Sequence, residues 1–306
     1  MHEILYQVGV AVDSAARLGE SPLWHPVEQV LYYVDIPACQ VLRFDPESQA
    51  LTRWDVVTEV GCLAPIEAAQ GGGLLLAQRD GLWRLDTASG ERRRLAAAPY
   101  DTLTQRFNDG KADPQGRFWA GTMQEPGEPA LAGLYRYAGG EFARMADQVA
   151  TANGLAWSPD GRLLYWADTR AHTVFVFDFD ATRGSIANQR VFARFAPREA
   201  GQPLSAYGGR PDGAAVDAHG NYWLAMYEGQ RLVQLSPTGE LLREVALPVR
   251  CPTMPCFGGS DLRTIYVTSA CAKRPAAELA EQPWAGYVLQ LRVQTPGLSA
   301  NFAKLA

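Results

Sequence analysis

Histidine and cysteine are scarce in this sequence, and neither is spaced as in a metal or redox site. The 306 residues include four histidines and five cysteines, and no two cysteines stand in the CxxC spacing of zinc sites and redox pairs. We therefore predict reduced, buried thiols, as is usual in a cytoplasmic protein. His25 and His219 stand at turns, and we expect both side chains to be exposed.

The short motifs of several large enzyme classes are also absent. The sequence has no GxSxG elbow, which argues against a hydrolase with a Ser-His-acid triad. No GxGxxG or P-loop motif follows a strand pattern, so nucleotide binding has no support. We interpret the glycine run at residues 71–73 as a hairpin turn.

Charge of one sign is not concentrated anywhere. The net charge is −5, and basic residues are dispersed except for the arginine triplet at residues 92–94, which is too small a patch to bind nucleic acid. The first residues read as a strand and not as a long apolar run, so we expect neither a secretory signal nor a membrane span. These features predict a cytoplasmic protein that is a monomer or a weak oligomer.

A repeated unit runs along the whole chain. Its clearest copy, at residues 153–168, contains an apolar strand, a Ser-Pro-Asp-Gly turn and a second strand. Proline fixes φ at the second turn position, and glycine supplies the left-handed one. The second strands of successive copies begin 43, 43, 46, 58 and 43 residues apart, at Leu31, Leu74, Arg117, Leu163, Asn221 and Thr264.

Each second strand is followed by a turn and a third apolar run. A repeat of about 40 to 50 residues with about four strands is typical of a β-propeller blade. We therefore predict an all-β protein, with one domain over residues 1–306, folded as a six-bladed β-propeller of four-stranded antiparallel blades. Residues 4–12 are expected to close the ring by pairing with the sheet formed within residues 257–291.

Four oxygen-bearing side chains share one position of the repeat. The residues that open the hairpin turns are His25, Asp113, Ser158 and Asp217. Five residues before them lie Glu20, Asn108, Asn153 and Asp212. Equivalent positions of the innermost strands converge on the central channel of a propeller, so we expect these four to meet at one end of it. The two other copies place apolar residues near this position: Ala64 or Pro65, and Met254, Pro255 or Cys256.

Two carboxylates and two carboxamides crowded together would repel one another or stay unsatisfied without a cation between them. For any one of them alone, hydrogen bonding to a turn would explain an Asn or Asp, but four at a common offset favour a metal site. Oxygen ligands without histidine or thiolate suit a divalent ion. We predict one such ion, which is Ca²⁺, Zn²⁺, Mn²⁺, Mg²⁺ or Fe²⁺.

Five segments resemble the SMP-30/gluconolactonase/regucalcin family of sugar lactonases. In chain order they are GESPLW (19–24), RFNDGKADPQGRFWAGTM (106–123), NGLAWSPDG (153–161), PDGAAVDAHGNYWLA (211–225) and FGGSDLRTIYVTSA (257–270). The likeness extends over nearly the whole chain in the right order. It implies a six-bladed propeller that hydrolyses sugar lactones with one divalent metal ion.

The resemblance also implies roles for single residues. The family's metal ligands fall on Glu20, Asn153 and Asp212. Asn108 and Arg106 match positions that hold the substrate or the metal's water, and Glu125 is the nearest match to an acidic residue that contacts the sugar.

A mechanism follows from these assignments. We expect the ion to polarise the lactone carbonyl and Asp212 to accept a proton from the attacking water. The loops at residues 123–130 and 197–209 would select among lactones such as gluconolactone, xylonolactone and arabinonolactone.

Three alternatives stay open. The protein could be a metal-dependent hydrolase of other esters, such as phosphotriesters. It could be a scaffold without catalysis, but the polar ring would then have no purpose. It could also be a calcium-binding regulator, which the ring alone does not distinguish from an enzyme.

Overall fold

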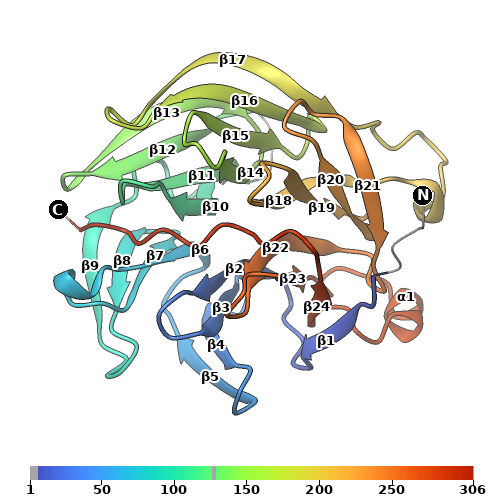
Figure 1. Cartoon of the computed structure of the whole chain (residues 1–306), viewed down its shortest axis with the longest axis horizontal. Helices are drawn as coiled ribbons and strands as arrows, with labels where there is room; N and C mark the ends of the chain where they lie inside the picture. Colours follow the sequence, from blue (N-terminus) through green and yellow to red (C-terminus); the bar gives the residue numbers. More distant parts are fainter. Residues whose placement is uncertain (1–5, 126–128, 306) are drawn as a thin grey trace.

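The computed structural model describes residues 6–125 and 129–305, and its strands form six four-stranded sheets. Neighbouring strands are antiparallel throughout, as in β2 with β3 and β10 with β11. The six sheets are arranged as blades around a central channel (Figure 1). The predicted six-bladed β-propeller is therefore confirmed.

Each blade has one inner strand beside the channel and three strands outside it. Blade one contains β2 (Gly19–His25), β3 (Val30–Asp35), β4 (Gln40–Asp45) and β5 (Ala50–Asp55). Blade two contains β6 (Val60–Pro65), β7 (Leu74–Gln78), β8 (Gly81–Leu85) and β9 (Arg92–Ala97). Blade three contains β10 (Gln105–Ala112), β11 (Phe118–Gln124), β12 (Ala132–Ala138) and β13 (Glu141–Val149).

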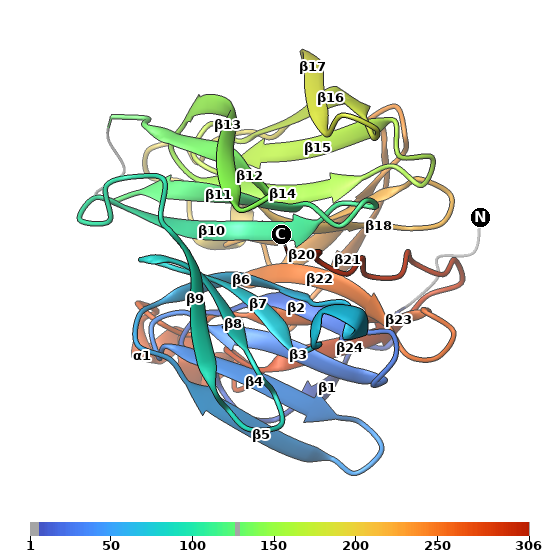
Figure 2. The same cartoon turned by 90° about the vertical axis from the view of Figure 1, so that its left-hand side faces the viewer.

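The remaining three blades follow the same plan. Blade four contains β14 (Ala152–Trp157), β15 (Leu163–Asp168), β16 (Thr173–Asp180) and β17 (Ser185–Arg194). Blade five contains β18 (Arg210–Val216), β19 (Tyr222–Tyr227), β20 (Arg231–Leu235) and β21 (Leu241–Ala246). Blade six contains β22 (Pro252–Gly258), β23 (Thr264–Ser269), β24 (Val288–Arg292) and β1 (Gly9–Val12). In the side view, β10 and β14 lie next to each other (Figure 2).

Helical segments are short. In the part of the chain that the structure describes, they are the 3₁₀ turns η1 (Ala68–Gln70) and η2 (Leu204–Ala206) and the helix α1 (Ala276–Glu281). Within the described residues, no helix has the length and apolar character needed to cross a membrane.

The N-terminal strand closes the ring at blade six. β1 pairs antiparallel with β24, with Gly9 opposite Gln290 and Val12 opposite Val288. This confirms the predicted closure, although the strand begins at Gly9, and residues 4 and 5 of the predicted segment lie outside the described residues. The pairing covers the edge of β24, which would otherwise present free backbone groups.

A C-terminal segment, residues 294–305, ties several blades together at one end of the channel. Its backbone is hydrogen-bonded to Ala218 in blade five, Leu262 in blade six, Pro65 in blade two and Gly116 in blade three. In Figure 1 this segment crosses the centre of the ring. No feature of the repeat predicts this second closure.

Buried aspartates fix the inner hairpins of blades three and five. Asp113 accepts the backbone N–H groups of Gln115 and Arg117, and its other oxygen accepts the indole N–H of Trp119 at 2.9 Å. Asp217 likewise accepts the indole N–H of Trp223, at 3.0 Å. Because one carboxylate satisfies both the turn and the second strand, it sets the register of each hairpin.

The histidine and cysteine predictions hold only in part. His219 is exposed, but His25 is buried, because its ring packs edge-on against Phe302 of the C-terminal segment. All five cysteines are free, as predicted, yet Cys39 and Cys271 are only partly buried.

Candidate active site

The predicted site residues lie where the inner strands begin, at one end of the channel. Glu20 and Asn153 are the second residues of β2 and β14, Asp212 is the third residue of β18, and Arg106 and Asn108 belong to β10. A register shift follows or includes each of these positions. Such β-bulges change the direction in which nearby side chains point. The side chains at these positions therefore do not alternate between the two faces of the strand in the regular two-residue pattern.

Glycine is required behind Asn153. Gly154 has a φ of 62°, and a Cβ added to it would lie 2.3 Å from the hydroxyl oxygen of Tyr222. That hydroxyl donates to the Gly154 carbonyl oxygen at 2.7 Å. The close approach of β19 therefore fixes the backbone that presents Asn153.

A chain of hydrogen bonds joins the polar residues of blades three and four. Arg106 Nη1 donates to Asn108 Oδ1 at 2.8 Å. Asn108 Nδ2 donates in turn to Asn153 Oδ1 at 3.1 Å, and Asn153 Nδ2 donates to Thr169 Oγ1 at 2.8 Å. All three site residues are buried, so these bonds hold both amides in fixed orientations.

Glu20 and Asp212 bring two carboxylates to the same place from blades one and five. Their exposed fractions are only 7% and 6%. Burial raises the pKa of Glu20 well above its usual value, and the nearby Asp212 and Asp109 carboxylates raise it further. Burial also raises the pKa of Asp212, with Asp109 adding to the effect. The cluster is therefore costly to ionise without a cation.

The residues present fit a divalent cation. In the described part of the chain, no three His, Cys, Asp or Glu side chains group as a metal site, but this cluster supplies oxygen from an amide as well. Two buried carboxylates are available, and among residues 6–125 and 129–305 no cationic side chain forms an ion pair with either. Hard oxygen donors with this unbalanced charge suit Ca²⁺ or a similar ion.

Glu125 lies at the rim of the site and is paired with Arg79, a residue that was not predicted from the sequence. Arg79 Nη2 lies 2.6 Å from Glu125 Oε2, and Arg79 also binds Glu59 through two hydrogen bonds of 2.9 and 3.1 Å. The other Glu125 oxygen lies 3.6 Å from Arg106 Nε. Arg79 directly follows β7, the second strand of blade two, at this end of the channel. This position in the repeat is the sequence feature from which its place at the rim could have been predicted.

Asp109 and Lys111 continue the charged series along the channel. Asp109 Oδ2 accepts the Leu155 N–H at 2.8 Å. Lys111 Nζ donates to the carbonyl oxygens of Leu155 at 2.8 Å and Ala214 at 2.5 Å, which ties β10 to β14 and β18. Neither residue was assigned a role from the sequence, although a two-residue spacing on a strand suggests one common face.

Blade two does not contribute the residues that we predicted. A Cβ on Gly61 would lie 2.3 Å from the Phe107 carbonyl oxygen and 2.8 Å from that of Asn108, so Gly61 lies at the level of the site. Ala64 and Pro65 instead line a cavity at the opposite end. The prediction was wrong because the connection between β6 and β7 contains η1 and is longer than the corresponding connection in the other blades. Counting residues backwards from this longer turn therefore ends near the C-terminal end of β6 and not at its beginning.

Comparisons with known proteins agree with this architecture. The family described as "SMP-30/Gluconolactonase/LRE-like region" matches residues 18–271. The 6-deoxy-6-sulfogluconolactonase of Pseudomonas putida is 42% identical over 289 residues, which cover 94% of both chains. Human regucalcin is 35% identical over 284 residues and 90% of both chains. The crystal structure of Agrobacterium tumefaciens regucalcin has a TM-score of 0.90 over 98% of both chains, at 24% identity, which shows the shared fold. This chain belongs to the SMP-30/gluconolactonase/LRE-like family.

Proposed function

We propose that this protein hydrolyses sugar lactones to aldonic acids with the help of one divalent metal ion. The observation that carries the proposal is the buried cluster of oxygen donors at the start of the inner strands, in which Glu20 and Asp212 have no cationic partner among the described residues. The 42% identity to a protein named as a sulfogluconolactonase supports the substrate class.

Glu20, Asn153 and Asp212 would hold the ion through oxygen atoms. When bound, the ion polarises the lactone carbonyl and stabilises negative charge on its oxygen. Two hydrogen bonds orient Asn153: its Nδ2 donates to Thr169 Oγ1 at 2.8 Å, and its Oδ1, the atom that would bind the ion, accepts from Asn108 Nδ2 at 3.1 Å. The oxygen ligands favour a hard divalent cation, and we propose no single element.

The remaining residues bind the lactone and move the proton. Asn108 Oδ1 accepts from Arg106 Nη1, so Asn108 orients the Arg106 guanidinium as a donor for the ring oxygens or the developing oxyanion. Asp212 accepts the proton from the water that attacks the carbonyl carbon, and it returns this proton to the ring oxygen as the bond between that oxygen and the carbonyl carbon breaks. A lactone is an activated ester, so modest general-base assistance is enough.

Selectivity for the sugar would lie at the rim. Glu125 is held by Arg79 at 2.6 Å and offers an acceptor for a sugar hydroxyl. In the second loop, His172 Nε2 and the Tyr207 hydroxyl are 2.6 Å apart, which anchors residues 197–209 to blade four. We propose that these two loops choose between five-carbon and six-carbon lactones. Residues 126–128 of the first loop lie outside the described residues.

The test is a substrate panel measured with and without chelation. Acid release would be followed for gluconolactone, xylonolactone, arabinonolactone and a phosphotriester, always above spontaneous hydrolysis. We expect lactone turnover that a chelator removes and a divalent metal restores. Glu141→Gln, a change of an exposed carboxylate on β13, is the matched control and should behave like the parent.

Two results would contradict the proposal. Turnover of the phosphotriester alone would identify an esterase of another class. Metal binding without turnover of any lactone would favour a binding protein.

A further inference from the structure

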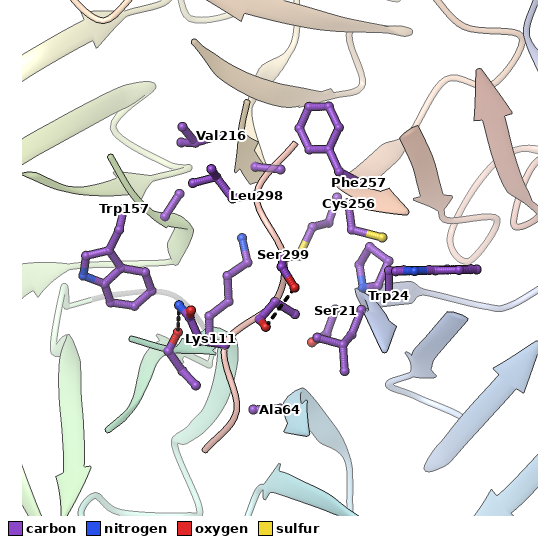
Figure 3. Close-up of a pocket in the computed structure, with 18 of the residues that line it drawn as sticks. Ser21, Trp24, Ala64, Lys111, Trp157, Val216, Cys256, Phe257, Leu298 and Ser299 are labelled. Carbon is purple, nitrogen blue, oxygen red and sulfur yellow. Dashed lines mark hydrogen bonds between the residues drawn. The ribbon is translucent and has the colours of Figure 1, made fainter. Parts of the chain in front are cut away.

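A second cavity lies in the channel at the end opposite the candidate active site. Its volume is about 360 Å³, within the usual range for small-molecule sites. The walls come mainly from the last residues of the inner strands, among them Trp24, Trp157 and Phe257. In Figure 3 these residues lie around a common space that Lys111 enters from β10. The Trp24 indole points away from this space and is stacked on Tyr266.

The C-terminal segment forms the outer wall of this cavity. It is anchored on one side by the Gly297 N–H bond to Leu262 at 2.8 Å and on the other by the Ala303 N–H bond to Pro65 at 2.6 Å. Between the anchors, Leu298 lines the cavity and is 37% exposed. The segment therefore separates part of the cavity from solvent.

Among the described residues that line the cavity, Lys111 is the one with a charged side chain. Its ammonium donates two hydrogen bonds, to the Leu155 and Ala214 carbonyl oxygens. An ammonium group carries three N–H donors. Within the described residues, the third has no hydrogen-bond partner, and no carboxylate lies within 4 Å of Nζ.

Burial makes this arrangement unfavourable for a charged lysine, and it lowers the Lys111 pKa from its usual value. The Asp109 carboxylate, on the same strand, partly offsets this lowering of the Lys111 pKa. One of its oxygens accepts the Leu155 N–H. A carboxylate placed in the cavity would supply the missing acceptor and the missing charge at once.

We propose that this cavity is a binding site for a small carboxylate with an apolar body, seated with its carboxylate on Lys111 and its hydrocarbon part against Trp157. A sugar acid would fit poorly, because the walls are mainly apolar and would leave its hydroxyls without partners. The site is therefore distinct from the lactone site, and the proposal does not depend on the lactonase function.

Hexanoate and its neutral analogue hexanamide test the inference. Binding to the full-length protein would be followed by titration calorimetry and by tryptophan fluorescence, since Trp24 and Trp157 line the cavity. We expect saturable binding of one hexanoate per chain, and at least tenfold weaker binding of hexanamide. Lys111→Met keeps the apolar stem and removes the charge, so it should weaken hexanoate binding at least tenfold.

A second pair of variants keeps the test decisive if Lys111→Met folds poorly. Leu298→Glu places a competing carboxylate in the outer wall, at a partly exposed position that tolerates it. It should reduce hexanoate affinity at least tenfold, whereas the matched Leu298→Gln should retain binding. The proposal is overturned if the parent does not bind hexanoate, if hexanamide binds equally well, or if Leu298→Glu binds hexanoate like the parent.

Discussion

Asn108 donates a side-chain hydrogen bond to Asn153 over 3.1 Å, although the two residues are 45 positions apart in the chain and belong to different blades. The same Asn108 amide nitrogen donates to the Ala152 carbonyl oxygen at 3.0 Å, and its oxygen accepts from Arg106. The pair therefore links the residue proposed to hold the metal with those proposed to hold the substrate.

We predict that Asn108→Ala separates these two roles. The variant should retain stoichiometric metal, because Glu20, Asn153 and Asp212 remain, while kcat for lactone hydrolysis falls by about 10²-fold because Arg106 loses the acceptor that orients it. Metal analysis and steady-state kinetics would measure both effects. Loss of the metal as well would identify Asn108 as a ligand.

Glu20 and Asp212 should each be needed for the metal. In Glu20→Ala and Asp212→Ala, one of two buried carboxylates is gone, and a divalent ion loses half of its neutralising charge. We expect metal content after dialysis to fall far below one per chain, whereas Glu141→Gln keeps it. Stoichiometric metal in both alanine variants would remove the proposed ligand set.

Asp212→Asn tests the role of general base apart from that of ligand. The amide keeps the size and one coordinating oxygen but does not accept a proton from water. With excess metal to restore occupancy, lactone turnover should drop by about 10²-fold or more. A metal-saturated variant that works at close to the parent rate would show that Asp212 is only a ligand.

The stability of the metal-free protein should fall as the pH rises, whereas the stabilisation gained on adding metal should grow. The folded-state pKa values of Glu20 and Asp212 are raised, so the metal-free folded protein keeps protons that the unfolded chain releases above the ordinary carboxyl pKa of about 4. Its stability therefore falls as the pH rises from that value through the raised pKa values.

Metal binding requires the same carboxylates to be deprotonated, so the increase in Tm on adding metal should grow with pH. Melting curves between about pH 5 and pH 8, with chelator and with metal, would measure it. A flatter metal-free profile is expected for Glu20→Gln. A metal effect that shrinks as the pH rises would contradict the assignment.

The N-terminal closure can be tested by truncation. Removing residues 1–12 deletes β1 and leaves β24 as a free sheet edge, so we expect aggregation or a less cooperative, lower melting transition. Removing only residues 1–5 leaves β1 in place and is the control. Equal melting of the two truncated proteins would mean that β1 contributes little to closure.

Much of the fold could be predicted because it depends on local turn chemistry. Pro159 and Gly161 set one hairpin, and buried Asp113 and Asp217 set two others, so the repeat and its strand positions follow from neighbouring residues. The convergence of Glu20 with Asp212 also follows from sequence, because radial repetition brings equivalent positions together.

Contacts between distant residues could not be predicted in this way. Phe302 buries His25 only because the C-terminal segment returns across the ring, and Arg79 reaches Glu125 only because blades two and three lie side by side. The sequence by itself determined the repeat, the six blades and the oxygen donors on the inner strands. Each of these depends on local backbone preferences that recur in every copy of the repeat, and the copies are arranged around one axis. Tertiary structure alone decided the rim of the site, the outer wall of the second cavity and the two backbone carbonyl groups that Lys111 binds. These depend on packing between segments that are far apart in the chain.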